Sequence, residues 1–268
     1  MTQHSPSEQV AANGADKGVW RVFVSASSRC FAELPFFEAC PLMADLEFDK
    51  VEIWLADGSE HLQPADVAAD PDAFATQYRD ITRLTPVAFF LGCDVPPAVL
   101  GGIAKAAKLL RAAQVTVPAS PLGTPFNTEV DRLRDYVARA GADGVRISIK
   151  SQTGFLSEDP RTAVELCQAV PGLGITLDPS YYICGPHAGE SFDQIYPHVY
   201  HVHLRDTSPQ AVQVPVGLGE VDYSRLITHL EKVRYRLALS VDFETSEMST
   251  ETRQLEMRKL RMLLDSLL

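Results

Sequence analysis

Strand-like and helix-like segments follow one another through most of this chain of 268 residues. Pro86–Leu91 is a continuous apolar run, as in a strand buried on both faces, whereas Thr252–Leu268 carries apolar residues at helical spacing. This alternation predicts a parallel sheet covered by helices. About eight strand–helix units in this length predict a single (β/α)₈ TIM barrel of the α/β class. A doubly wound open sheet is the alternative, but no GxGxxG motif follows the first strand to indicate its nucleotide-binding form.

Composition restricts the class of protein further. The formal net charge of −11 disfavours nucleic acid as a partner, and the chain has no run of about 18 apolar residues that would predict a membrane helix. Five cysteines without a CxxC pair are typical of reduced thiols, so we expect a cytoplasmic protein. Residues 1–18 are polar and small and lack a secretion signal, which predicts a disordered lead-in before a barrel domain over 19–268. The sequence gives no evidence for or against a homo-oligomer.

Four consecutive strands of the second half end in a polar side chain on the inward-facing side. In Val145–Lys150, for example, Ile147 and Ile149 share one side, and Ser148 and Lys150 share the other. In a barrel such strand ends meet at one mouth, so we expect a shared site there. A structural salt bridge is the alternative. The four residues at the strand ends are Lys150, Asp178, His203 and Asp242.

Three of these side chains are suitable ligands for a divalent metal. Asp178, His203 and Asp242 offer the mixed oxygen and nitrogen donors that Mn²⁺, Co²⁺, Zn²⁺ or Fe²⁺ accepts. Glu244 is a further candidate ligand. A metal there would polarise a carbonyl or enediolate oxygen, and a nearby carboxylate would move the proton on the adjacent carbon.

Lys150 conflicts with this metal site, because a dication repels an ammonium group at short range. In one hypothesis the metal is bound and Lys150 turns aside toward a substrate oxygen. In another, Lys150 replaces the metal, pairs with Asp178 or Asp242 and itself stabilises a developing oxyanion. A Schiff-base lysine is a third interpretation, which nothing in the sequence singles out.

Motifs of the second half resemble those of the sugar phosphate isomerase/epimerase family, a group of xylose-isomerase-like TIM barrels. They are Gly-Ile-Thr-Leu-Asp-Pro (174–179), His-Val-His-Leu-Arg-Asp (201–206), Gly-Leu-Gly-Glu-Val-Asp-Tyr (217–223) and Leu-Ser-Val-Asp-Phe-Glu (239–244). The resemblance runs from about Asp45 to the C-terminus and includes Asp49–Ile53 as the family's second strand. It is moderately specific for the superfamily and weak for any one activity.

The resemblance implies a metal set at the ends of the fifth to eighth strands. This chain keeps Asp178 and His203 of that set, and Asp242 stands for the eighth-strand glutamate with a shorter side chain. Lys150 occupies the place of the fifth-strand glutamate. In the epimerases the two glutamates also transfer the proton, so we expect Lys150 and Asp242 to be the catalytic residues here.

Further positions that match the family are expected to bind the substrate. Glu52 lies within the second strand, and Arg205 lies on the loop after the seventh. Gln152 and Tyr181 stand where the family often has histidines, and Glu220 keeps the second glutamate of a Gly-Glu-Gly-Glu motif. The alternatives are a charge bound to a neighbouring lysine or arginine inside the barrel for Glu52 and an exposed ion pair for Arg205.

The sequence favours an isomerase or epimerase that acts through an enediolate on a small keto-sugar, polyol or hydroxy-carbonyl compound. A divalent metal (Mn, Co, Zn or Fe) is the expected cofactor, and a small sugar-like molecule is the expected partner. The alternative is a metal-less barrel that binds a metabolite or takes part in a protein assembly, and Lys150 separates the two hypotheses. A DNA-repair endonuclease is disfavoured, because the chain has neither a rich set of zinc ligands nor a basic groove.

Overall fold

The computed structural model describes residues 22–268, so the lead-in predicted at 1–18 lies outside the described residues. Eight parallel strands form a closed barrel in the order β1-β10-β7-β6-β5-β4-β3-β2. The barrel strands are β1 (Phe23–Ser27), β2 (Lys50–Leu55), β3 (Thr85–Leu91), β4 (Gln114–Pro118), β5 (Arg146–Lys150), β6 (Leu173–Leu177), β7 (Val199–Leu204) and β10 (Ala238–Val241). This closure confirms the predicted TIM barrel and excludes the open sheet.

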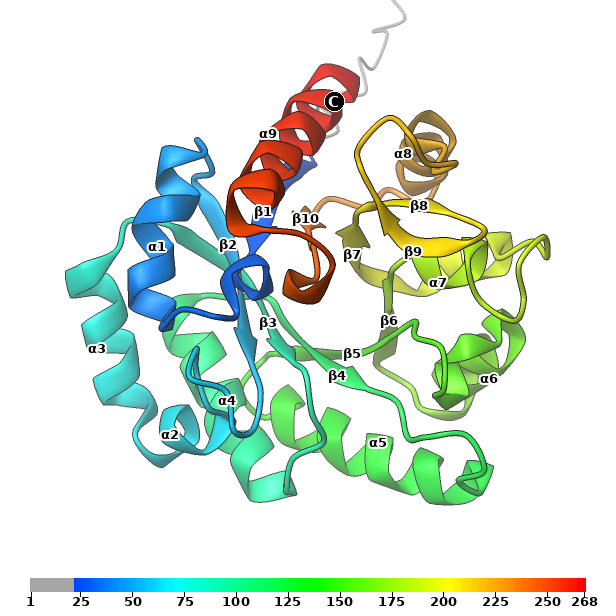
Figure 1. Cartoon of the computed structure of the whole chain (residues 1–268). Helices are drawn as coiled ribbons and strands as arrows, with labels where there is room; N and C mark the ends of the chain where they lie inside the picture. Colours follow the sequence, from blue (N-terminus) through cyan, green and yellow to red (C-terminus); the bar gives the residue numbers. More distant parts are fainter. Residues whose placement is uncertain (1–21) are drawn as a thin grey trace, which may run out of the picture.

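Helices connect the strands and surround the barrel (Figure 1). Their N-termini follow from local sequence: Asp70 and Asp222 accept hydrogen bonds from the backbone N–H of Ala73 and Arg225, and so cap α3 and α8. None of the helices between residues 22 and 268 has the length and apolar composition that crossing a membrane requires. The helices are α1 (Phe36–Asp45), α2 (Pro64–Ala69), α3 (Pro71–Ile81), α4 (Pro97–Leu110), α5 (Phe126–Gly141), α6 (Pro160–Ala169), α7 (Ser180–Ile183), α8 (Tyr223–Lys232) and α9 (Thr250–Leu267).

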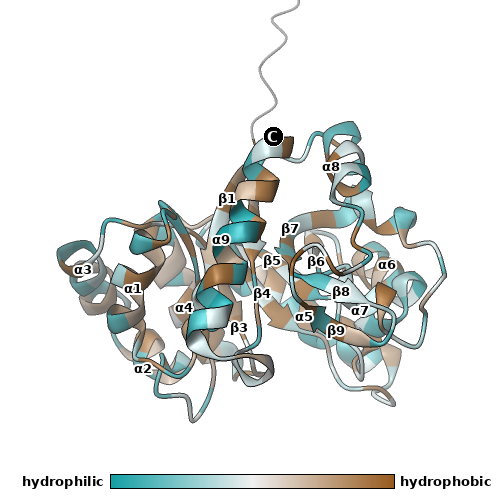
Figure 2. Cartoon of the chain, turned by 45° about the horizontal axis from the view of Figure 1, so that its top comes forward, coloured by the Kyte–Doolittle hydropathy of each residue, from teal (hydrophilic) through white to brown (hydrophobic). Residues whose placement is uncertain are grey.

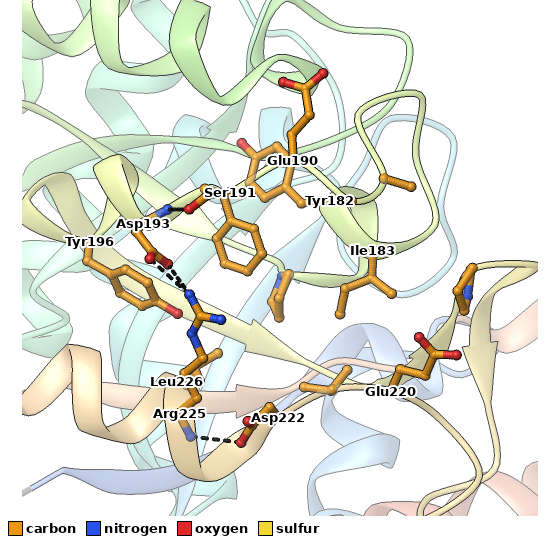
Figure 3. Close-up of a pocket in the computed structure, with 16 residues that line it drawn as sticks. Tyr182, Ile183, Glu190, Ser191, Asp193, Tyr196, Glu220, Asp222, Arg225 and Leu226 are labelled. Carbon is orange, nitrogen blue, oxygen red and sulfur yellow. Dashed lines mark hydrogen bonds and ion pairs between the residues drawn. The ribbon is translucent and has the colours of Figure 1, made fainter.

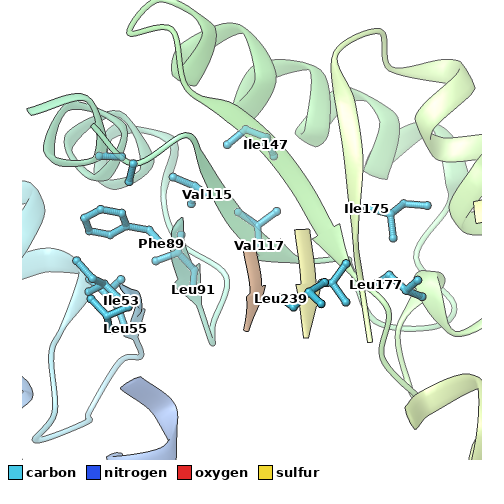
Figure 4. Packing of buried hydrophobic residues seen from close by; sticks show 14 of the residues in the cluster. Ile53, Leu55, Phe89, Leu91, Val115, Val117, Ile147, Ile175, Leu177 and Leu239 are labelled. Carbon is cyan, nitrogen blue, oxygen red and sulfur yellow. The ribbon is translucent and has the colours of Figure 1, made fainter. Parts of the chain in front are cut away.

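The hydrophobic core is the layer between the strands and the helices. Figure 4 shows side chains of this layer, among them Ile53, Phe89, Ile147 and Ile175, all of which are fully buried. In Figure 2 the barrel strands carry brown, hydrophobic residues, whereas the outer sides of the surface helices carry teal, hydrophilic residues. The apolar residues of each alternating strand therefore point outward to the helices, and burying this layer drives folding.

The inside of the barrel is polar. Thr116 on β4 and Thr176 on β6 join their hydroxyls at 2.8 Å across the intervening strand, and Ser148 of β5 lies 2.7 Å from the same Thr176 hydroxyl. A second hydroxyl pair joins Ser25 to Ser240 at 2.7 Å. Inward side chains from different strands therefore lie within hydrogen-bonding distance of one another. The inward residues at the strand ends converge in the same way.

A two-stranded antiparallel hairpin follows β7, which the sequence pattern did not predict. It comprises β8 (Asp206–Ser208) and β9 (Ala211–Val214). Asp206 Oδ2 accepts hydrogen bonds from the backbone N–H groups of Gly217 and Gly219, at 2.7 and 3.0 Å. A Cβ atom at position 219 would collide with the Asp206 carboxylate, so only glycine fits there. These contacts fix the course of the glycine-rich loop that leads to α8.

Candidate active site at the carboxyl end of the barrel

The four strand-end residues lie together at the carboxyl end of the barrel. Lys150 ends β5, His203 lies next to the end of β7, and Asp178 and Asp242 directly follow β6 and β10. All four are buried, with at most 1% of the residue exposed. They meet although they are far apart in the sequence, because the parallel strands of a closed barrel all end at the same rim.

Lys150 stands between the two aspartates. Its Nζ lies 3.2 Å from Asp242 Oδ2 and 3.5 Å from Asp178 Oδ2. The Phe90 ring lies over the ammonium group, with 4.7 Å from Nζ to the ring centroid. Burial lowers the pKa of Lys150, and the charge of the aspartates only partly offsets this. The ammonium group therefore bridges the two carboxylates from which a metal site was predicted.

Arg29 is a second cation of this centre, and it was not predicted. It lies in the short 3₁₀ turn after β1, where Nε and Nη2 donate to the two oxygens of Asp242 at 2.8 and 2.7 Å. This forked pairing is the strong geometry for a guanidinium and a carboxylate. Burial raises the pKa of Asp242, but the charges of Arg29 and Lys150 outweigh it and hold that pKa well below its usual range. No motif marked Arg29, because it lies in a turn rather than on a patterned strand.

Arg205 is the third cation, and it links two carboxylates. Its Nη2 donates to Asp178 Oδ2 at 2.5 Å, and its Nη1 donates to Glu244 Oε1 at 2.9 Å. The Arg205 side chain is fully buried, whereas 28% of the Glu244 side chain is exposed. The Tyr181 hydroxyl donates to Glu244 Oε1 at 3.3 Å, and the Tyr181 ring lies 5.3 Å from the Arg205 guanidinium. Glu244, Tyr181 and the partly exposed Arg29 therefore form the outer edge of the centre.

Glu52 lies below this edge, inside the barrel. Its Oε1 is 2.8 Å from His203 Nε2 and 3.1 Å from His201 Nε2. His203 Nδ1 faces Asp242 Oδ2 at 3.3 Å, so this imidazole stands between two carboxylates. Burial lowers the pKa of His203 despite these acids. Glu52 therefore joins the histidines to each other inside the barrel, and its partners are not the lysine or arginine that was considered for it.

The donor atoms of a metal site are assembled, but the charges around them do not fit a dication. One atom each of Asp178, His203 and Asp242 lie within 4.8 Å of one another, and Glu52, His201 and His203 form a similar group. The Oδ2 atoms of Asp178 and Asp242 already face Lys150, and each also accepts from an arginine. A divalent ion among Lys150, Arg29 and Arg205 would be strongly repelled. With these side chains in place, the centre does not fit the predicted metal.

Two predicted substrate-binding residues lie away from this cluster. Gln152 is half-buried on the loop after β5, and within residues 22–268 no hydrogen bond joins its side chain to the charged centre. Glu220 is exposed and lines a separate cavity next to α8. The family motif predicted that Glu220 binds the substrate, and the loop anchored by Asp206 carries it to the cavity next to α8.

The solved structures that resemble this one share its fold at low sequence identity. D-allulose 3-epimerase from Methylomonas sp. superposes with a TM-score of 0.71 at 13% identity, over 92% of this chain and 98% of that one. A xylose isomerase-like TIM barrel protein from Mycobacterium smegmatis, in complex with magnesium, gives 0.71 at 15% identity over 93% and 98%. The probable 3-DHS dehydratase AsbF from Bacillus anthracis gives 0.66 at 16% identity over 89% and 98%.

Sequence comparison identifies the family. A search of curated protein sequences found no match. The family model described as xylose isomerase-like TIM barrel, however, matches residues 41–265, which is most of the chain. This agrees with the region over which the motifs resemble the family. The chain therefore belongs to the xylose isomerase-like TIM barrel family.

Proposed function

We propose that this protein is an isomerase or epimerase that acts on a small keto-sugar, polyol or related hydroxy-carbonyl compound through an enediolate, without a divalent ion in its centre. The observation that carries the proposal is the position of Lys150 Nζ, 3.2 and 3.5 Å from the Oδ2 atoms of Asp242 and Asp178. An ammonium group there supplies, at the strand ends, the positive charge that an enediolate oxygen needs.

Glu244 is the proton-transferring base in this proposal. Of the carboxylates in the centre, its side chain is the one that solvent reaches. Burial raises its pKa, but Arg29 and Arg205 outweigh this and hold the pKa below its usual value, so Glu244 is ionised at neutral pH. It takes the proton from the carbon next to the carbonyl group, and the electron pair moves to the carbonyl oxygen. An isomerisation is completed when the proton returns to the former carbonyl carbon and a second proton passes from the neighbouring hydroxyl to the enediolate oxygen. Return of the proton to the opposite face of its original carbon by a second group completes an epimerisation.

Lys150 neutralises the oxygen that becomes negative in this step. Asp242 and Asp178 hold its ammonium group in position, and the Phe90 ring excludes water from one side. Asp242 is thus a positioning residue here rather than the acid that moves the proton. Only 2% of the Lys150 side chain is exposed, so a substrate reaches it when Tyr181 separates from Glu244, a contact of 3.3 Å. Loop movement of this kind is common in enzymes that exclude water from their reaction.

A binding module without chemistry is the second candidate function, and the charge balance of the centre favours it. Asp178, Asp242 and Glu244 are each paired with at least two cations, and such pairing weakens a carboxylate as a base. In that case the barrel binds a metabolite or a protein partner, and the buried ion pairs only hold the strand ends together.

Solvent exchange distinguishes these functions. Chelator-treated protein is incubated in D₂O with a panel of keto-sugars and hydroxy-carbonyl compounds, and proton NMR follows loss of the C–H signal next to the carbonyl. We expect exchange with at least one compound, and about 100-fold slower exchange for Glu244→Gln and Lys150→Met. Glu60→Gln is the matched control, because Glu60 is exposed on the β2–α2 loop. Exchange that requires added Mn²⁺ contradicts the metal-free chemistry, and no exchange with any compound favours the binding module.

A further inference from the structure

A second cavity lies beside the barrel, between the β6–β7 connection and the start of α8 (Figure 3). Its volume is about 640 Å³, which is in the range of small-molecule sites. Its walls come from residues between 179 and 196 and between 220 and 226, together with Pro209. None of the charged residues of the barrel centre lines it. It is therefore separate from the site described above.

Aromatic rings form one wall of this cavity. The Phe192 ring stands between Tyr182 and Tyr196, at centroid distances of 5.3 and 6.2 Å. Phe192 is half-buried, so a bound molecule reaches its ring. Ile183 and Leu226 add apolar surface next to the rings (Figure 3). Such a wall accepts a hydrocarbon chain, and aromatic faces also attract cations.

Tyr196 brings an unpartnered hydroxyl into the same cavity. Only 4% of this residue is exposed, and its hydroxyl makes no hydrogen bond to any residue between 22 and 268. The ring reaches from the Asp193–His198 turn toward Arg225 (Figure 3). The hydroxyl oxygen is not sealed from solvent, so it opens into the cavity that it lines. The oxygen is free to accept a hydrogen bond from a ligand.

The cavity also has an excess of negative charge. Arg225 is the only lysine or arginine among the lining residues of the described chain, and its Nη2 is already 2.9 and 3.0 Å from the two oxygens of Asp193. Glu190 has weak contacts, 3.3 Å to His187 and 3.6 Å to Arg161. The Glu220 carboxylate is exposed and has no ion-pair partner within residues 22–268. The carboxylates that line the cavity are Glu190, Asp193, Glu220 and Asp222.

We propose that this cavity binds an organic cation, namely an alkyl amine or diamine whose carbon chain packs on Phe192. Glu190 and Glu220 are drawn on two sides of Ile183 (Figure 3). The ammonium groups of a diamine pair with carboxylates that line the cavity. An ammonium group has three N–H donors, which the carboxylates and the Tyr196 oxygen accept. The site does not depend on the reaction proposed for the barrel centre.

Calorimetry with 1,5-diaminopentane tests this site, and 1,5-pentanediol has the same carbon chain without charge. At physiological salt we expect the diamine to bind and the diol not to bind. Glu220→Gln and Glu190→Gln are each expected to weaken diamine binding about tenfold, because each removes one charged hydrogen-bond acceptor. Tyr196→Phe is expected to weaken it by a smaller factor. Glu60→Gln removes the same charge far from the cavity and is expected to leave binding unchanged.

Three results would overturn the proposal. They are equal binding of diol and diamine, no diamine binding at millimolar concentration, and an equal loss of affinity in Glu60→Gln, which would indicate a diffuse surface effect. Glu220 and Glu60 are both exposed, so their variants are expected to fold, and unchanged thermal unfolding verifies this. The diamine titration needs no reaction at the barrel centre, so failure of either proposal does not affect the other.

Discussion

The barrel centre and the lateral cavity both gather carboxylates, but they differ in what faces them. In the centre, Arg29, Lys150 and Arg205 pair with the acids at the strand ends. The side chains of Lys150 and Arg205 are at most 2% exposed, and that of Arg29 is 15% exposed. In the cavity a single guanidinium, that of Arg225, faces four carboxylates around an open volume of about 640 Å³. The difference shows that acidic residues alone do not define a cation site. What matters is whether internal cations already neutralise them.

The two regions also differ in the cost of removing one charge. Buried ions have lost most of their hydration, so each depends on its partner. Exposed ions keep their hydration, and their pairing adds little to stability. Asp242 is fully buried, whereas 42% of the Asp193 side chain is exposed. The same Asp-to-Asn change in the two places therefore measures the difference directly.

Asp242→Asn is expected to have the largest effect on stability. It leaves the Arg29 guanidinium without its forked partner and Lys150 with one carboxylate fewer. The free energy of unfolding should fall by about 3–5 kcal/mol. Urea unfolding followed by circular dichroism measures it. A loss below about 1 kcal/mol would mean that this centre behaves like a surface ion pair.

Lys150→Glu is expected to convert the centre into a metal site. The change removes a competing cation from between Asp178 and Asp242 and adds an oxygen ligand. Millimolar Mn²⁺ should then raise the melting temperature of the variant by about 5 °C or more, with almost no effect on the unaltered protein. Lys150→Met is the control, because it removes the ammonium group without adding a ligand. An equal shift in the unaltered protein would count against internal cations in the metal position.

Stability is expected to decrease in acid because of the same carboxylates. Although burial raises the pKa of Asp178 and Asp242, neighbouring cations hold both below the ordinary value in the folded state. Their contribution is therefore complete above the unfolded pKa of about 4 and is lost as the pH falls toward the folded pKa. Asp242→Asn should make the slope of unfolding free energy against pH shallower by up to about 1.4 kcal/mol per unit below pH 4. An unchanged slope would show that Asp242 does not titrate in this way.

Asp193→Asn in the lateral cavity is expected to have the smallest effect. Its partner Arg225 has 58% of its side chain exposed, so water replaces the lost contact. The free energy of unfolding should change by less than about 1 kcal/mol in the same urea experiment. A loss as large as that of Asp242→Asn would remove the distinction between the two regions.

The barrel and the meeting of its strand ends were predictable from the sequence, because both follow from alternation. In Val145–Lys150 every second residue points inward. Ile149 points outward, so its neighbour Lys150 must point inward. The same argument places Asp178, His203 and Asp242 on the inner side of their strands. Closure of the barrel then brings them together.

The partners of these residues were not predictable, because they depend on tertiary contacts. Arg29 approaches Asp242 from a turn more than 200 residues away in the sequence. Arg205 was expected on a loop in contact with substrate, but it is fully buried between Asp178 and Glu244. Glu220 was predicted from a family motif, but the course of its loop depends on the hairpin, which was not predicted. Periodicity carries information about the direction of a side chain and none about its charge partners.

Elemental analysis of protein purified without chelator tests most directly whether internal cations take the place of a metal. With Arg29, Lys150 and Arg205 on the carboxylates, we expect less than about 0.1 equivalent of Mn, Fe, Co or Zn per chain. Near-stoichiometric metal that disappears in His203→Ala would contradict this, because it would place a divalent ion among three positively charged side chains.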